Sequence, residues 1–167
     1  MKLLSALAGL LLLVLGAGQA AAFFTLDGHE RWYYGRSDMM PFAPNVDGAI
    51  VIGSSPGGRV GQTLLHIDFL RGAGTQVRIE GECMSACTLV LSLPPCQRSY
   101  SSRSVWMFHA ARTSEGRIDH LVTAVMLERY PARVREFIGA RLHFPEADAE
   151  VVLYGDELAR LDDKCAP

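Results

Sequence analysis

Short apolar runs alternate with segments of helical periodicity, and this alternation is the feature that most restricts the fold of the chain. The apolar run at residues 48–53 is typical of a buried strand, and apolar residues from Val60 to Leu70 recur at helical spacing. The succession continues with expected strands at 76–80 and 105–108, and expected helices at 85–93, 118–142 and 154–161. Pro131 leaves open whether residues 118–142 form one helix or two. The alternation predicts a single α/β domain with largely parallel strands.

The first 22 residues have the pattern of a secretory signal peptide. Lys2 gives a positive start, an apolar run extends from Leu3 to Leu15, and small residues end at Ala20-Ala21-Ala22. The run is shorter than the roughly 20 residues of a membrane span, which favours cleavage over a retained anchor. We therefore expect a mature domain over residues 23–167, periplasmic or secreted, with no membrane association after cleavage. Asp27-Gly28 predicts a hairpin turn near its start.

The charge balance argues against nucleic acid as a partner. The chain has 16 Lys+Arg and 18 Asp+Glu, for a formal net charge of −2. Binding to a phosphate backbone needs clustered cations, which this composition does not offer. Hydrophobic residues make up 49% of the chain and charged residues 20%, which indicates a globular core rather than disorder.

The chain has four cysteines, at Cys83, Cys87, Cys96 and Cys165. An even number in an oxidising compartment indicates two disulfides, and four cysteines allow three pairings that the sequence alone does not distinguish. Zinc is the alternative, but Cys83-x3-Cys87 lacks the tighter C-x2-C spacing and no matching second pair follows. We expect neither a metal nor a cofactor.

Chemically reactive residues follow three of the expected strands. The segment Ser54-Ser-Pro-Gly-Gly58 follows the first, Ser85 opens the helix after the second, and His109 ends the third. Side chains gather where strands of such folds end, so a histidine there could serve as the base that a serine nucleophile needs. Backbone N–H groups of the glycine turn and of Ala86 could stabilise an oxyanion. The structural alternatives are a helix cap at Ser85, a packing role for His109 and a plain turn at the glycines.

Three stretches, in this order, resemble the ClpP peptidase family and the wider ClpP/crotonase superfamily. They are Ile50-Val-Ile-Gly-Ser-Ser-Pro-Gly-Gly58, the small-residue helix opened by Ser85, and Arg98-Ser-Tyr-Ser-Ser-Arg-Ser-Val-Trp-Met-Phe-His109. The chain looks most like the exported, cysteine-bearing ClpP-like proteins of bacteria, which have a similar Cys-x-Ser-Ala-Cys motif. The resemblance covers residues 48–111 and extends weakly to Leu161. The chain before Gly48 is too short for the family's first repeat, so a sheet trimmed at the N-terminus is expected.

The resemblance implies a spiral of β-β-α units and serine hydrolase chemistry. Ser85 would be the nucleophile, His109 the general base, and the N–H groups of Gly58 and Ala86 the oxyanion donors. The family's third residue is an acid, which the resemblance places at Glu150, with Asp148 close by. It also pairs Cys83 with Cys87, and it leaves Cys96 and Cys165 outside that motif. The substrate would be a peptide or a small acyl compound, and a homo-oligomer is compatible with the family.

Three functions are therefore compatible with the sequence. The first is an exported serine hydrolase that acts by acyl transfer. The second is a catalytically silent ClpP-like module that binds peptides or partners in the same cleft. The third is a structural, disulfide-bonded domain without a ligand, because a fold alone does not determine a function.

Overall fold

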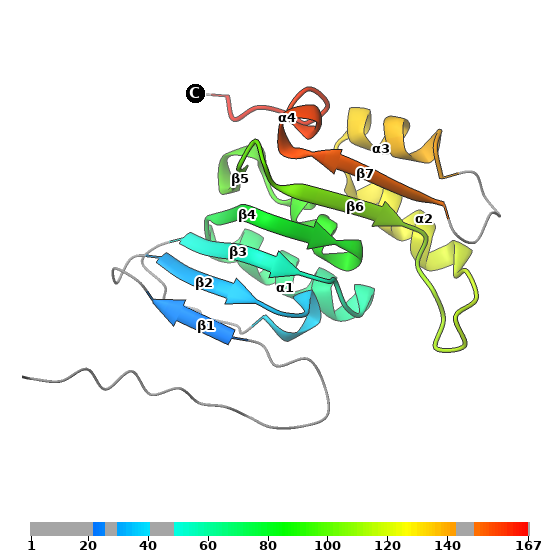
Figure 1. Ribbon diagram of the computed structural model, residues 1–167, viewed down its shortest axis with the longest axis horizontal. Helices are drawn as coiled ribbons and strands as arrows, with labels where there is room; N and C mark the ends of the chain where they lie inside the picture. The colour runs from blue at the N-terminus through cyan, green and yellow to red at the C-terminus, as the bar shows by residue number, and fades with distance from the viewer. Residues whose placement is uncertain (1–21, 26–29, 41–48, 143–148, 167) are drawn as a thin grey trace, which may run out of the picture.

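The computed structural model describes residues 22–25, 30–40, 49–142 and 149–166 (Figure 1). The predicted signal peptide lies outside these ranges except for Ala22, which is the first residue of strand β1 (Ala22–Thr25). The predicted Asp27-Gly28 turn and the alternative acid Asp148 also lie outside them. Among the described helices, none is long and apolar enough to cross a membrane.

Seven strands form one mixed sheet in the order β1-β2-β3-β4-β6-β7, with β5 paired to β4. After β1 they are β2 (Glu30–Tyr34), β3 (Ala49–Ser55), β4 (Val77–Met84), β5 (Arg98–Tyr100), β6 (Val105–His109) and β7 (Glu150–Tyr154). Strands β2, β3, β4 and β6 are parallel, whereas β1 and β7 are antiparallel to their neighbours at the two edges. The predicted α/β class and the parallel centre of the sheet are confirmed. The short strand β5 and the antiparallel edge strand β7 were not predicted.

The helices lie close to the predicted positions. They are α1 (Val60–Ala73), α2 (His120–Arg129), α3 (Ala132–Gly139) and α4 (Gly155–Leu158), with 3-10 helices η1 (Ser37–Met39), η2 (Ser85–Ser92) and η3 (Pro95–Gln97). Pro131 separates α2 from α3, so residues 118–142 form two helices because proline cannot continue the hydrogen-bond ladder. The predicted helix at 85–93 forms as the 3-10 helix η2. Figure 1 shows α1 and α2 behind the strands, on one face of the sheet.

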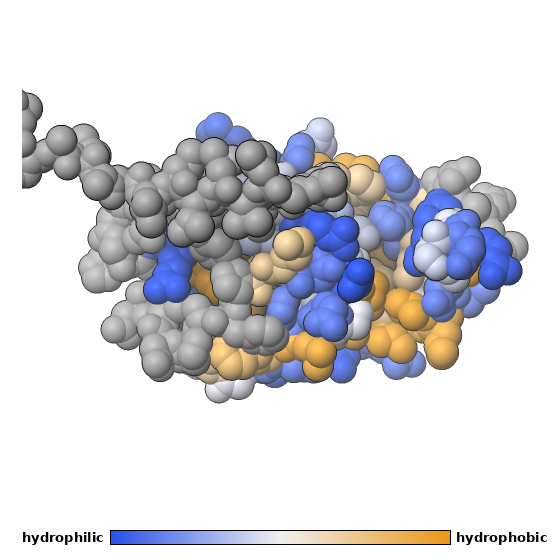
Figure 2. Space-filling view, turned by 90° about the horizontal axis from the view of Figure 1, so that it is seen from below, coloured by the Kyte–Doolittle hydropathy of each residue, from blue (hydrophilic) through white to orange (hydrophobic). Residues whose placement is uncertain are grey.

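The core lies between the sheet and the helices. Fully buried side chains come from the central strands and from η2, including Ile52, Ile79, Leu89, Trp106 and Phe108. Removing such apolar surface from water is the main stabilising contribution, roughly 25 cal/mol per Å². This packing holds the C-terminal ends of β3, β4 and β6 in position relative to each other. Figure 2 shows hydrophilic and apolar residues side by side on one face of the molecule.

Two disulfides are present, as the even number of cysteines indicated, and one of them is the Cys83–Cys87 bond that the family resemblance implies. Cys83 is bonded to Cys87 and Cys96 to Cys165, and the described residues contain no free cysteine. The second bond ties the C-terminal segment to the domain beside a buried ion pair, in which Arg98 Nη2 lies 2.5 Å from Asp162 Oδ1. Two disulfides indicate an oxidising compartment.

Candidate functional site

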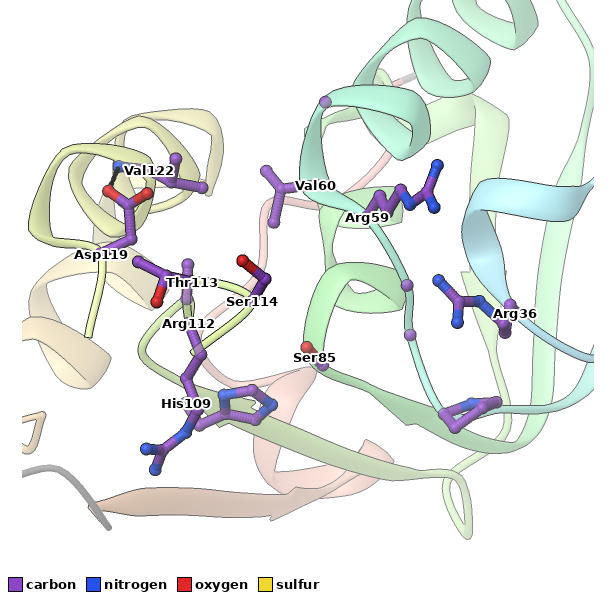
Figure 3. A pocket seen from close by; sticks show the side chains of 15 residues that line it. Arg36, Arg59, Val60, Ser85, His109, Arg112, Thr113, Ser114, Asp119 and Val122 are labelled. Carbon is purple, nitrogen blue, oxygen red and sulfur yellow. Dashed lines mark hydrogen bonds between the residues drawn. The ribbon is translucent and has the colours of Figure 1, made fainter. Parts of the chain in front are cut away.

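Three parallel strand ends meet at one cavity of about 600 Å³ (Figure 3). Ser55 pairs with Cys83, and Met84 pairs with Met107, so the segments that follow β3, β4 and β6 lie next to each other. The cavity is lined by the Pro56–Gly61 segment, by Ser85 and His109, and by residues of the chain from Ala111 to Val122. The structure therefore brings together Ser85, His109 and Gly58, as predicted from their positions after strands.

Ser85 has an unusual backbone conformation. Its φ is 54°, and among the described residues it is the only non-glycine residue with a positive φ. The left-handed region is unfavourable for residues with a Cβ, and such residues cluster at functional sites. The cap interpretation is wrong, because the N-cap of η2 is Met84 and no side chain makes a capping hydrogen bond there. The turn thus places the Ser85 hydroxyl at the cavity, and this hydroxyl does not cap the start of η2.

The turn at Ser85 is held on both sides. The Cys83–Cys87 disulfide brackets it, with Cα atoms 5.3 Å apart, and both cysteines are buried. The Thr88 hydroxyl donates to the Ser85 carbonyl oxygen at 2.6 Å and also lies 2.6 Å from the Tyr130 hydroxyl. Burial raises the pKa of Tyr130, which keeps that hydroxyl protonated. These contacts maintain the strained conformation of the serine.

His109 ends β6 and is half-buried at the cavity. Its Nδ1 lies 2.7 Å from the carbonyl oxygen of Ala110, and because a carbonyl only accepts, Nδ1 carries the proton. In the neutral ring this tautomer leaves Nε2 free to accept a proton, as a general base must. Figure 3 shows the imidazole extending toward the Ser85 side of the cavity. No hydrogen bond between these two described side chains is present.

Glu150 lies opposite His109 in the antiparallel pairing of β6 with β7. Its side chain is exposed. Within the described residues, no hydrogen bond or ion pair involves its carboxylate. The assignment of Glu150 as the acid behind the imidazole stays a prediction, and Ala110 supplies the hydrogen bond to Nδ1 in this structure.

The glycine segment approaches Ser85 at distances that require glycine. Gly57 has φ +89°, and a Cβ there would lie 2.6 Å from Ser85 Cβ and 2.9 Å from the Ala86 nitrogen. A Cβ on Gly58 would lie 2.2 Å from Asp38 Oδ1. No acceptor for the Gly58 N–H is present in the described part of the chain. The Ala86 N–H belongs to the first turn of η2, which has no intrahelical acceptor. Two donors thus lie near the serine.

Sequence reasoning missed several residues of the cavity. Arg36 reaches it from the segment after β2, and Thr113 and Ser114 come from a hairpin closed by the Arg112–Ile118 bridge. Asp119 also lines the cavity, and its carboxylate caps α2 by accepting from the Val122 N–H at 3.0 Å. An aspartate directly before an apolar periodic segment is a helix-start signal that could have identified it. A lone arginine or a hairpin serine carries no such signal.

The described residues contain no group of three or more His, Cys, Asp or Glu that could hold a metal ion. No family model matches the chain, and no curated protein matches it.

Proposed function

We propose that this chain is a small exported serine hydrolase, a trimmed member of the ClpP/crotonase type that acts on peptides or small acyl compounds. One observation carries the proposal: the strained Ser85, His109 and a glycine segment with a free N–H line the same cavity. The two disulfides and the signal-like N-terminal sequence support a periplasmic or secreted location.

The residues suggest acyl transfer in two steps. Ser85 Oγ attacks the substrate carbonyl carbon while His109 Nε2 takes the hydroxyl proton, and the N–H groups of Gly58 and Ala86 bind the oxyanion. When the tetrahedral intermediate collapses, the imidazolium gives its proton to the leaving group, and an acyl-enzyme remains. Water, deprotonated by the same imidazole, then releases the acyl group as a carboxylic acid and restores the Ser85 hydroxyl.

A fluorophosphonate probe tests this proposal directly. We expect covalent labelling at Ser85, identified by peptide mass spectrometry, at a rate that falls at least about 100-fold in His109→Ala. Ser92→Ala is the matched control, because this half-buried serine at the far end of η2 is outside the cavity lining. Labelling that is absent in wild type, or unchanged in Ser85→Ala, would contradict the proposal.

A catalytically silent binding module is the second candidate. The observation that favours it is the missing hydrogen bond between Ser85 and His109, although catalytic hydrogen bonds often form only with substrate bound. The module predicts that wild type and Ser85→Ala bind a peptide library equally well and that neither releases products. The hydrolase predicts turnover by wild type alone.

A further inference from the structure

Residues 36–38 contact the segment that carries Gly57 and Gly58, on the side opposite Ser85. The Ser37 N–H donates to the Gly57 carbonyl oxygen at 2.9 Å. Ser37 is itself anchored to α1: its hydroxyl lies 2.9 Å from the Thr63 hydroxyl, and its carbonyl oxygen accepts from His66 Nδ1 at 3.2 Å. Ser37 and Thr63 are fully buried, so this anchor is shielded from water.

Asp38 fixes the next peptide group. Its carboxylate accepts from Arg36 Nε and Nη2, each at 2.9 Å, and also from the backbone N–H of Arg59. The side chain is only 7% exposed and packs against Gly58. The Arg36 guanidinium lowers the pKa of Asp38, so the carboxylate stays charged and remains a strong acceptor.

These contacts determine the direction of the Gly58 N–H. A trans peptide group is planar, and its C=O and N–H point in opposite directions. The Gly57 carbonyl points to Ser37, so the Gly58 N–H in the same plane points away from Ser37. Figure 3 shows Arg36 and Ser85 on opposite sides of the segment that leads into Arg59. The N–H therefore faces the side of the segment on which Ser85 lies.

We propose that Ser37 and Asp38 are positioning residues, which orient the Gly58 N–H toward the oxyanion that forms at Ser85. This inference rests on the proposed function. It adds the requirement that the Gly58 N–H be oriented before the reaction, because a donor stabilises a developing charge best when its orientation is already set. Ser37 and Asp38 would touch no reacting atom and would act only through Gly58.

Ser37→Pro tests the backbone hydrogen bond. Proline lacks the N–H, and it suits the first residue of η1, where the preceding Arg36 has an extended ψ of 134°. We expect kcat for an activated ester to fall about 10²–10³-fold while KM changes little, because the lost interaction is strongest in the transition state. Binding of a trifluoromethyl ketone, which forms a tetrahedral adduct with Ser85, should weaken by a similar factor. Ser37→Ala measures the effect of the hydroxyl alone, and the ratio of the two variants reports the N–H.

Asp38→Ala tests the same positioning role with a second variant, which is needed because proline at the buried position 37 can prevent folding. We expect a fall in kcat of about 10-fold or more, smaller than for loss of a donor, and partial rescue in Asp38→Asn, which retains the shape. Asp68→Ala is the matched control, because this exposed aspartate on α1 also pairs with arginine, at 2.5 Å from Arg71 Nη1. Full kcat and full ketone affinity in a folded Ser37→Pro or Asp38→Ala protein would overturn the positioning role alone. A wild type that neither turns over the ester nor reacts with the fluorophosphonate would overturn the proposed function and this inference with it.

Discussion

His109 and Glu150 are paired residues of the antiparallel β6–β7 ladder, so their side chains leave the same face of the sheet. Nevertheless, the imidazole Nδ1 donates to the Ala110 carbonyl, 2.7 Å away, rather than to the carboxylate. The backbone thus already performs the part of a triad acid that selects the tautomer. The Glu150 side chain is exposed and makes no hydrogen bond with a described residue, so we expect it to contribute only a weak, solvent-screened attraction to the imidazolium.

Glu150→Gln should therefore reduce kcat/KM by less than about 5-fold, because an exposed charge pair contributes roughly 0–1 kcal/mol. His109→Ala should abolish turnover. Hydrolysis of an activated ester by the two purified variants measures both effects. A loss in Glu150→Gln as large as that in His109→Ala would show that the carboxylate moves into contact with the ring during the reaction.

The sequence predicted the centre of the fold well because the central elements carry strong local signals. The apolar run of β3 and the periodic residues of α1 are local signals, and both elements appear in the structure. At Pro131 the sequence left one helix or two helices open, and the structure has two. β7 was missed because Glu150–Tyr154 alternates for only five residues, and its antiparallel pairing with β6 is a long-range property. No pattern in the sequence around Asp38 indicates that its side chain packs against Gly58, because that contact joins residues 20 positions apart.

The sequence predicted which residues come together at the candidate site but not the backbone conformation of Ser85. Ser85, His109 and Gly58 follow strands, and the parallel sheet brings such positions together. The left-handed conformation of Ser85 could not be read from the sequence, because a serine is compatible with a helix cap as well as with a strained turn. The Cys83–Cys87 disulfide and the Thr88 hydroxyl hold this turn, but neither the cysteine motif nor the threonine indicates the φ of the residue between them.

Ser85→Gly should be more stable than Ser85→Ala, and both should be inactive. Glycine adopts a positive φ without a Cβ penalty of roughly 1–2 kcal/mol, part of which is offset by the greater freedom of glycine in the unfolded chain. We expect a net difference of about 0.5–1 kcal/mol in the free energy of unfolding, measured by urea titration. Equal stability of the two variants would mean that residue 85 leaves the left-handed region when its hydroxyl is lost.

The two disulfides should separate stability from activity. Chain entropy gives about 2 kcal/mol for the bond that spans 4 residues, Cys83–Cys87, and about 4 kcal/mol for the bond that spans 69, Cys96–Cys165. The double alanine variant at 96 and 165 should therefore melt at the lower temperature but retain kcat when assayed well below its Tm. The variant at 83 and 87 should lose kcat at the same temperature, because it releases the Ser85 turn. If activity followed Tm alone in both variants, the bracketing bond would have no special role at the site.

Acid should remove a stabilising contribution from Asp38. Its pKa is lowered in the folded state, chiefly by the hydrogen bonds from Arg36, so the folded protein binds fewer protons at this group than the unfolded chain does. The contribution is therefore fully present above the ordinary aspartate value of about 3.9 and is lost as pH falls below it. We expect wild type to exceed Asp38→Asn in free energy of unfolding at pH 7, and the gap to narrow progressively below about pH 4. Urea titrations at several pH values measure it, and a gap that stays constant would exclude this linkage.

Gly57→Ala should abolish activity and destabilise the fold, whereas Gly72→Ala should stabilise it. A Cβ at residue 57 would lie 2.6 Å from the Met84 carbonyl oxygen and 2.6 Å from Ser85 Cβ, with a φ of +89° that alanine rarely adopts. Backbone and a short side chain cannot move aside as a long side chain can, so the glycine segment must shift away from Ser85. We expect a loss of about 2 kcal/mol or more in free energy of unfolding, from the clash and the strained φ together.

At Gly72, near the end of α1, a Cβ would meet nothing within 4 Å, and alanine should add up to about 1 kcal/mol to the free energy of unfolding through its helix propensity. Thermal melts and ester hydrolysis on both variants test the pair. A fully active Gly57→Ala protein would show that the close approach of this segment to Ser85 is not needed for catalysis.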